Sequence, residues 1–174
     1  MRQLFVAVVA GLAGLISAPA FAADVEVKGP HICCKQCVSA VNKILGAVDG
    51  VNNVKPDIKG KSVTFVAKDE AAAKAGIKAL VAGGFFGSAT CDGKELKVDA
   101  PAPAKGEQVK SIQVKNVHAC CQQCHTAIRA LFKDAKVTIE GTGAQRTVTI
   151  EGPGLERSAV IETLRSKGFN GNID

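Results

Sequence analysis

The sequence predicts an α+β fold made of two small domains in tandem. A seven-residue motif, H-x-C-C-x-x-C, occurs at His31–Cys37 and again at His118–Cys124, with the His and all three Cys equally spaced in both copies. Around each copy the hydrophobic pattern alternates between periods of two and 3.6 residues, in the order β-α-β-β-α-β. A Pro/Ala-rich segment at residues 99–108 has the composition of a linker. We therefore expect domains at residues 23–98 and 109–174.

The elements of the first domain follow from local patterns. Alternating apolar and polar residues predict strands, and apolar residues three or four apart predict amphipathic helices. Pro56 places its strand at a sheet edge, since it cannot donate to a neighbour. Asp69 is a candidate N-cap, and Gly83-Gly84 a candidate helix end. The predicted elements are a strand at 25–28, a helix from Cys37 to Val48, strands at 51–58 and 62–66, a helix after Asp69 and a strand between Phe85 and Val98.

The second domain repeats this order. Gly168-Phe169 corresponds in place to Gly84-Phe85, and the chain ends at Asp174, so the final strand must be short. The order β-α-β-β-α-β is the ferredoxin-like arrangement, in which two helices cover a four-stranded antiparallel sheet. The predicted elements are a strand with Ile112 and Val114, a helix with Ile128, Leu131 and Phe132, strands at 137–139 and 148–150, and a helix with Val160, Ile161 and Leu164.

Residues 1–22 have the layout of a secretory signal peptide. Arg2 precedes an apolar run, and Ala20 and Ala22 occupy the −3 and −1 positions of a cleavage site after Ala22. The run is shorter than the roughly 20 residues that a membrane span needs, although an uncleaved anchor stays an alternative. We expect a periplasmic or secreted protein with no membrane association after cleavage.

The composition excludes several classes of function. The chain has 47% hydrophobic and 22% charged residues, which is typical of a globular protein. It lacks Trp and Tyr, and its net charge of +6 comes from dispersed Lys and Arg residues, so we expect no nucleic-acid partner. No Ser-His-Asp pattern, phosphate-binding Gly loop or open zinc site with a Glu base is visible. The sequence therefore does not predict an enzyme.

The repeated motif concentrates thiol chemistry, because it holds six of the seven cysteines. A C-x-x-C pair is compatible with a metal site, a redox pair or a disulfide. Adjacent Cys33 and Cys34 cannot bridge without strain, so two simple disulfides explain the layout poorly. The predicted helix N-terminus also favours thiolate at Cys37. These arguments favour a site for a soft metal, and Cys91, which has no counterpart in the second domain, is interpreted as a strand residue.

Each half resembles the heavy-metal-associated domains of copper chaperones, periplasmic mercury-binding proteins and metal-pumping ATPases. That family carries a G-M-x-C-x-x-C loop between its first strand and first helix. The resemblance implies metal ligands at Cys34 and Cys37 in the first domain and at Cys121 and Cys124 in the second. Ile32 and Ala119 stand near the position at which the family usually has a Met that packs into the core beneath the loop. Cys33 and Cys120 replace a Thr, at a position where zinc-handling relatives can carry a third ligand.

The resemblance implies one soft metal ion per domain, namely Cu(I), Zn(II), Cd(II) or Hg(II). His31 and His118 are further candidate ligands, whereas His125 occurs in one copy only and is a weaker candidate. We expect an exported protein that captures, buffers or transfers the ion, with a metal transporter or another metal-binding domain as partner. A solvent-facing loop would permit such transfer. The alternative is a periplasmic thiol-disulfide oxidoreductase or redox buffer, although the second motif has no Pro near its thiols.

Overall fold

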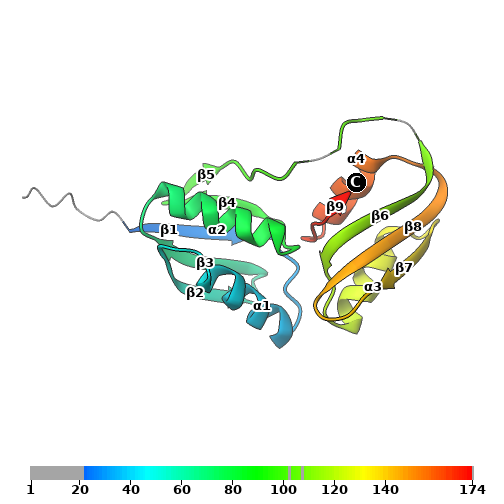
Figure 1. The fold of residues 1–174 in the computed structure, drawn as a ribbon. Helices are drawn as coiled ribbons and strands as arrows, with labels where there is room; N and C mark the ends of the chain where they lie inside the picture. Colours follow the sequence, from blue (N-terminus) through cyan, green and yellow to red (C-terminus); the bar gives the residue numbers. More distant parts are fainter. Residues whose placement is uncertain (1–21, 102, 107, 174) are drawn as a thin grey trace, which may run out of the picture.

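The computed structural model describes residues 22–101, 103–106 and 108–173, which form two lobes joined by the segment after residue 96 (Figure 1). We call residues 22–101 the first half and residues 108–173 the second half. The predicted signal peptide lies outside the described residues, apart from Ala22. Within the described residues the chain has two antiparallel sheets and four helices, so the α+β class is confirmed.

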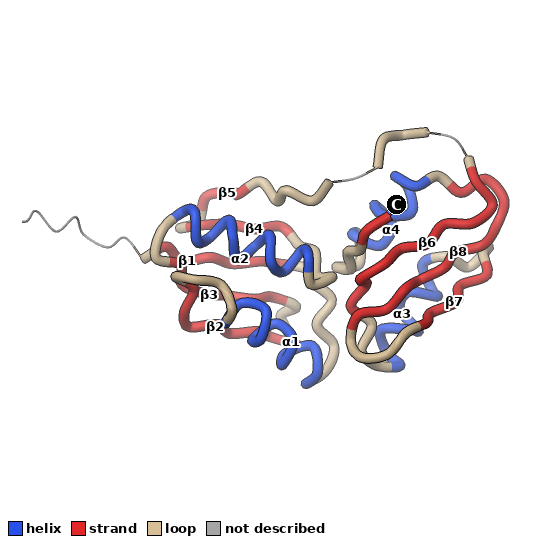
Figure 2. The backbone as a smooth tube through the Cα atoms, viewed as in Figure 1, coloured by secondary structure: helices blue, strands red, loops and turns tan. Residues whose placement is uncertain are grey.

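The first half contains a five-stranded sheet with the order β2-β3-β1-β4-β5. Its helices α1 and α2 run along the sheet (Figure 2). The prediction of four strands is one short, because the chain turns at Asp92-Gly93 and adds a hairpin strand. The elements are β1 (Ala23–Lys28), α1 (Lys35–Gly46), β2 (Val51–Asp57), β3 (Ser62–Ala67), α2 (Glu70–Ala82), β4 (Ser88–Cys91) and β5 (Lys94–Leu96).

The second half contains a four-stranded sheet with the order β7-β8-β6-β9. Within the described residues the last strand has two residues, in agreement with the prediction of a short final strand. The elements are β6 (Val109–His118), α3 (Gln122–Leu131), β7 (Lys136–Glu140), β8 (Gln145–Leu155), α4 (Arg157–Arg165) and β9 (Asn172–Ile173).

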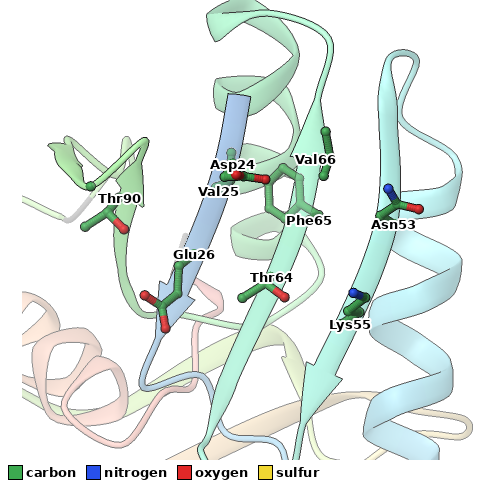
Figure 3. A pocket seen from close by; sticks show the side chains of 10 residues that line it. Asp24, Val25, Glu26, Asn53, Lys55, Thr64, Phe65, Val66 and Thr90 are labelled. Atoms are coloured by element: carbon green, nitrogen blue, oxygen red, sulfur yellow. The ribbon is translucent and has the colours of Figure 1, made fainter. Parts of the chain in front are cut away.

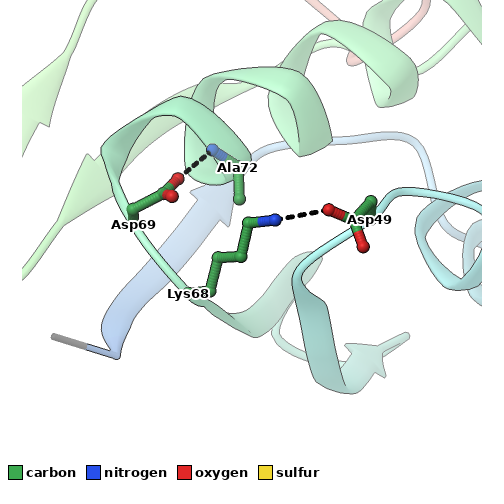
Figure 4. A network of polar contacts seen from close by, with 4 residues as sticks. All are labelled: Asp49, Lys68, Asp69 and Ala72. Atoms are coloured by element: carbon green, nitrogen blue, oxygen red, sulfur yellow. Dashed lines mark hydrogen bonds and ion pairs between the residues drawn. The ribbon is translucent and has the colours of Figure 1, made fainter. Parts of the chain in front are cut away.

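Several local predictions for the first half are confirmed. Pro56 lies in β2, which is an edge strand with a register shift between Asn52 and Lys55. Asp69 caps α2, since its carboxylate accepts a hydrogen bond of 2.7 Å from the backbone of Ala72 (Figure 4). Beside it, Lys68 forms an ion pair with Asp49. The prediction that the first helix reaches Val48 is wrong, because α1 ends at Gly46.

The hydrophobic core of each half lies between its sheet and its helices. Alternate residues of each central strand face the helices, so Val25 and Val27 of β1 are buried. Phe65 of β3 packs closely on α2 at Gly76, where an added Cβ would come within 2.9 Å of its ring. In the second half Val114, Ile128, Val148, Ile150 and Leu164 are fully buried. This packing fixes the start of α1 and of α3, where the cysteine motifs lie.

Candidate metal centre

Each cysteine motif forms the turn into a helix. Cys34 and Cys121 are the N-cap residues of α1 and α3, with extended backbones and no capping hydrogen bond from their side chains. Cys37 and Cys124 lie in the first turn of the same helices. The unpaired N–H groups and the positive end of the helix dipole therefore face the sulfurs and favour thiolate over thiol. The position of Cys37 at the start of a helix agrees with the sequence prediction.

Beneath each loop a small apolar residue anchors it to the core. Ile32 has 2% of its surface exposed and Ala119 has none. Both belong to the hydrophobic core. The backbone N–H of Ala119 also donates to the carbonyl of Ala144, which ties the second loop to the start of β8. These contacts anchor both loops to the core.

The two halves contact each other through aromatic and imidazole rings. His31 of the first half stacks on Phe169 of the second, with ring centroids 4.1 Å apart. Phe85 of the first half packs against His118 of the second, with ring centroids 4.4 Å apart. Phe85 and Phe169 also form an isolated antiparallel bridge. The contact is nearly symmetric, since equivalent residues of the two copies take equivalent places in it.

Two glycines allow the backbones of the halves to approach closely. Gly84 and Gly168 both have positive φ angles, of 90° and 80°. A Cβ at Gly84 would lie 2.4 Å from the nitrogen of His118, and one at Gly168 would lie 2.1 Å from the carbonyl oxygen of Gly29. Backbone hydrogen bonds of 3.1 Å from His31 to Gly168, of 3.0 Å from Phe86 to Gly168 and of 2.9 Å from Asn170 to Gly84 also join the halves.

This contact brings all six motif cysteines into one cluster between the halves. The sulfur of Cys33 lies 3.5 Å from those of Cys121 and Cys124, which are themselves 3.6 Å apart. In the reverse sense, the sulfur of Cys120 lies 3.6 Å from those of Cys34 and Cys37, which are also 3.6 Å apart. Each C-x-x-C pair therefore receives its third thiol from the other half. We call these two groups of three the crossed triads.

The crossed triads correct the expectation of two separate, solvent-facing loops. The predicted third ligands do join C-x-x-C pairs, but Cys33 joins the second pair and Cys120 the first. Cys33 also lies 3.8 Å from Cys37 of its own half. Cys37 and Cys124 are fully buried, and the other four motif cysteines are partly buried. All seven cysteines of the chain are free thiols.

Burial and mutual contact control protonation within the cluster. Burial raises the pKa of the Cys33 and Cys120 thiols well above its ordinary value, and neighbouring sulfurs add to this effect. A hydrogen bond between Cys124 and Cys37 lowers the pKa of Cys37 and raises that of Cys124, so these two sulfurs share a proton. Without a cation the cluster is thus held partly as thiols and partly as thiolate. A metal ion that binds there displaces the remaining protons.

The two motif histidines lie at the edge of the cluster. A ring nitrogen of His31 comes within 4.8 Å of the sulfurs of Cys33 and Cys124. Burial lowers the pKa of His31 and favours the neutral ring. His118 is only 2% exposed, and the Nε2 atoms of both rings are buried without a hydrogen-bond partner. Buried polar atoms without partners are uncommon in proteins, and here His31 lies beside Cys33 and Cys124 while His118 lies beside Cys37.

The remaining candidates lie outside the cluster. Cys91 ends β4, where it pairs with Lys94 of β5, so its interpretation as a strand residue is confirmed. His125 lies in α3, and its Nε2 is 3.2 Å from the carbonyl oxygen of Ala119. Local sequence patterns do not predict the packing of Phe85 and Phe169 between the halves. Their matched Gly-Phe pairs were a visible signal, because a glycine can mark a close approach of two backbones.

Two cavities differ in their chemistry. One of about 500 Å³ lies over the first sheet, where Asp24, Glu26 and Lys55 line it with Thr64 and no cysteine or histidine (Figure 3). The other, of about 650 Å³, lies between the halves, with His31 and Cys33 in its wall and Lys61 and Lys167 beside them. The second cavity gives a route from solvent to the cluster.

Comparisons with known proteins do not identify the chain. No protein-family model matches the sequence, and neither does any curated protein. In the part of the chain that the structure describes, no helix is long and apolar enough to cross a membrane. The functional argument therefore depends on the cluster itself, whose cysteine and histidine side chains are placed to hold a metal ion.

Proposed function

We propose that this protein binds a soft, thiophilic metal ion through its six motif cysteines. The observation that carries the proposal is the pair of crossed triads, in which thiols far apart in the chain converge without forming disulfides. Thiolates prefer Cu(I), Zn(II), Cd(II) and Hg(II) to hard cations. An imidazole beside the sulfurs, such as that of His31, would add a nitrogen donor for Zn(II).

The sulfur separations fit a site with three thiolate ligands. An ion with metal–sulfur bonds of about 2.3 Å to three thiolates would space those sulfurs about 4 Å apart. The observed separations of 3.5 to 3.8 Å need an expansion of only a few tenths of an ångström to reach that value.

Burial favours capture and holding over rapid transfer. Cys37 and Cys124 have no exposed surface, and each crossed triad spans the contact between the halves. Handing an ion to a transporter or to another metal-binding domain would require that contact to open, or a partner thiol to enter the cavity beside Cys33. We therefore propose buffering or storage as the main role, with transfer as a slower one.

The proposal includes the fold family and the location. The strand orders and the helix placement support two ferredoxin-like domains of the heavy-metal-associated type. The layout of residues 1–22 supports export to the periplasm or beyond. In such an oxidising compartment, a bound metal would also protect the thiols from oxidation, because it would coordinate the sulfur lone pairs that an oxidant attacks.

The test is metal analysis of protein purified anaerobically and fully reduced, beside an insulin-reduction assay. We expect tight binding of Cu(I), Zn(II), Cd(II) or Hg(II), no binding of Mg(II) or Ca(II), and no catalytic reduction of insulin. Catalytic reduction by a reduced protein that binds no soft metal would replace this proposal with the thiol-disulfide oxidoreductase. A variant with Cys91→Ser is the matched control, since that thiol lies outside the cluster.

A further inference from the structure

The six sulfurs are close enough to share several ions rather than to hold one ion in each half. In each of three groups, the three sulfurs all lie within 4.8 Å of one another. These groups are Cys33-Cys34-Cys121, Cys34-Cys37-Cys120 and Cys120-Cys121-Cys124. A fourth group is Cys33-Cys37-Cys124, in which Cys33 lies 3.8 Å from Cys37 and 3.5 Å from Cys124, while Cys37 and Cys124 share a hydrogen bond.

These four groups form a closed cage. Every one of the six cysteines belongs to two of the groups, and any two groups have one cysteine in common. An ion at the centre of each group would have three thiolate ligands, and each thiolate would bridge two ions. A monovalent soft ion such as Cu(I) accepts three thiolates, and a thiolate sulfur has lone pairs enough for two ions.

We propose that the two halves together hold one polynuclear Cu(I)–thiolate cluster, with four ions at full occupancy, instead of one ion per domain. This inference depends on the proposed function, because it specifies the ion and the stoichiometry of the same site. Three of the four triangular groups contain cysteines from both halves, so the complete cluster cannot form in one half alone.

Charge and surroundings agree with such a cluster. Six thiolates and four monovalent ions leave a charge of about −2, which is far less than six thiolates alone would carry. The N-termini of α1 and α3 direct their free N–H groups and positive dipole ends at it. The rings of His31, His118, Phe85 and Phe169 shield the cluster on the side where the halves contact each other. A shielded cluster exchanges ions slowly, as a buffer or store requires.

The test is an anaerobic titration of the full, reduced chain with Cu(I) against a chromophoric chelator, followed by native mass spectrometry. We expect more than two ions per chain, four at saturation, with metal-free and fully loaded species side by side because binding is cooperative. X-ray absorption of the loaded, unmodified chain should show a copper–copper shell just beyond the sulfur shell. Two or fewer ions, non-cooperative binding, or no copper–copper shell would overturn the cluster.

A variant separates this inference from the proposed function. With Cys120, Cys121 and Cys124 all changed to Ser, the first half keeps its own three cysteines. Independent sites predict one ion held there with unchanged affinity, whereas a shared cluster predicts at least a tenfold loss and no cooperative species. Retained affinity would overturn the shared cluster but leave metal binding intact. If the reduced parent binds no soft ion at all, both proposals fail. The Cys91→Ser variant should load like the parent.

Discussion

The sulfurs of Cys33 and Cys121 lie 3.5 Å apart, although 88 positions separate the two residues in the chain. Their neighbours explain this approach, because the loop that carries Cys33 is docked on the second half through His31 and Gly168. The contact that joins the two halves is therefore also what builds the candidate metal site. Changes at this contact should alter metal binding even where no ligand is touched.

The first prediction tests this link at Gly168. In Gly168→Ala the new Cβ would lie 2.1 Å from the carbonyl oxygen of Gly29 and 2.4 Å from the backbone nitrogen of His31, so the halves must separate locally. We expect a loss of more than about 2 kcal/mol in the free energy of unfolding. Metal affinity should fall as well, because the crossed triads move apart. Denaturant unfolding and competitive metal titration measure the two effects.

Gly143 offers a matched control for this change. Its φ of 77° is close to the 80° of Gly168, but nothing lies within 4 Å of an added Cβ. Gly143→Ala should therefore cost only the backbone strain of about 1–2 kcal/mol and leave metal affinity unchanged. Equal effects of the two variants on metal binding would show that the docking of the halves does not build the site.

Local sequence patterns predicted most of the elements and their caps. The alternation at β1, the proline of the edge strand β2 and the Asp69 cap act within a few residues, so they are readable from the chain. The docking of the two halves is different, because no periodicity encodes which surface of one domain meets the other. The same reason explains why Cys33 and Cys120 were expected to complete their own pairs rather than the opposite ones.

The second prediction concerns Cys33 and Cys120 together. Replacing both by Ser removes one sulfur from each crossed triad and leaves both C-x-x-C pairs in place. We expect Zn(II) and Cd(II) affinity to fall by a larger factor than the affinity for the first Cu(I), because two thiolates satisfy Cu(I) but not the divalent ions. Competitive titration with each metal gives the comparison. Binding of all metals as in the parent would mean that the adjacent cysteines are not ligands.

The third prediction is the pH dependence of the metal-free, reduced protein. The folded state raises the pKa of Cys33, Cys120 and Cys124 above the ordinary value of 9.0. Above pH 9 the unfolded chain loses these protons while the folded chain keeps them, so the stability they contribute is lost as the pH rises. The pKa values of Cys37 and Cys121 are lowered, so these two groups oppose the trend only until the unfolded chain has also lost their protons, just above pH 9.

Thermal unfolding between pH 8 and 10.5 tests this expectation under anaerobic conditions. The midpoint of the metal-free protein should fall as the pH rises through this range. The metal-loaded protein should show a smaller fall, since coordinated sulfurs carry no proton to lose. The variant with Cys33, Cys120 and Cys124 all changed to Ser should lose most of the dependence. A parent midpoint that stays constant or rises over the range would contradict the assignment.

The fourth prediction concerns His118, whose Nε2 is buried without a partner. The ring is 2% exposed and packs against Phe85. In His118→Phe the unpaired nitrogen disappears while the ring contact is kept, so we expect the metal-free protein to gain about 1 kcal/mol of stability. Metal affinity should fall about tenfold, because a polar group beside the thiolates is lost.

His125→Gln, which changes a histidine of α3 outside the cluster, should leave metal affinity unchanged. If His118→Phe binds metal as tightly as the parent, the imidazole serves only packing. Unfolding and competitive metal titration of the two variants, both done anaerobically, distinguish these outcomes.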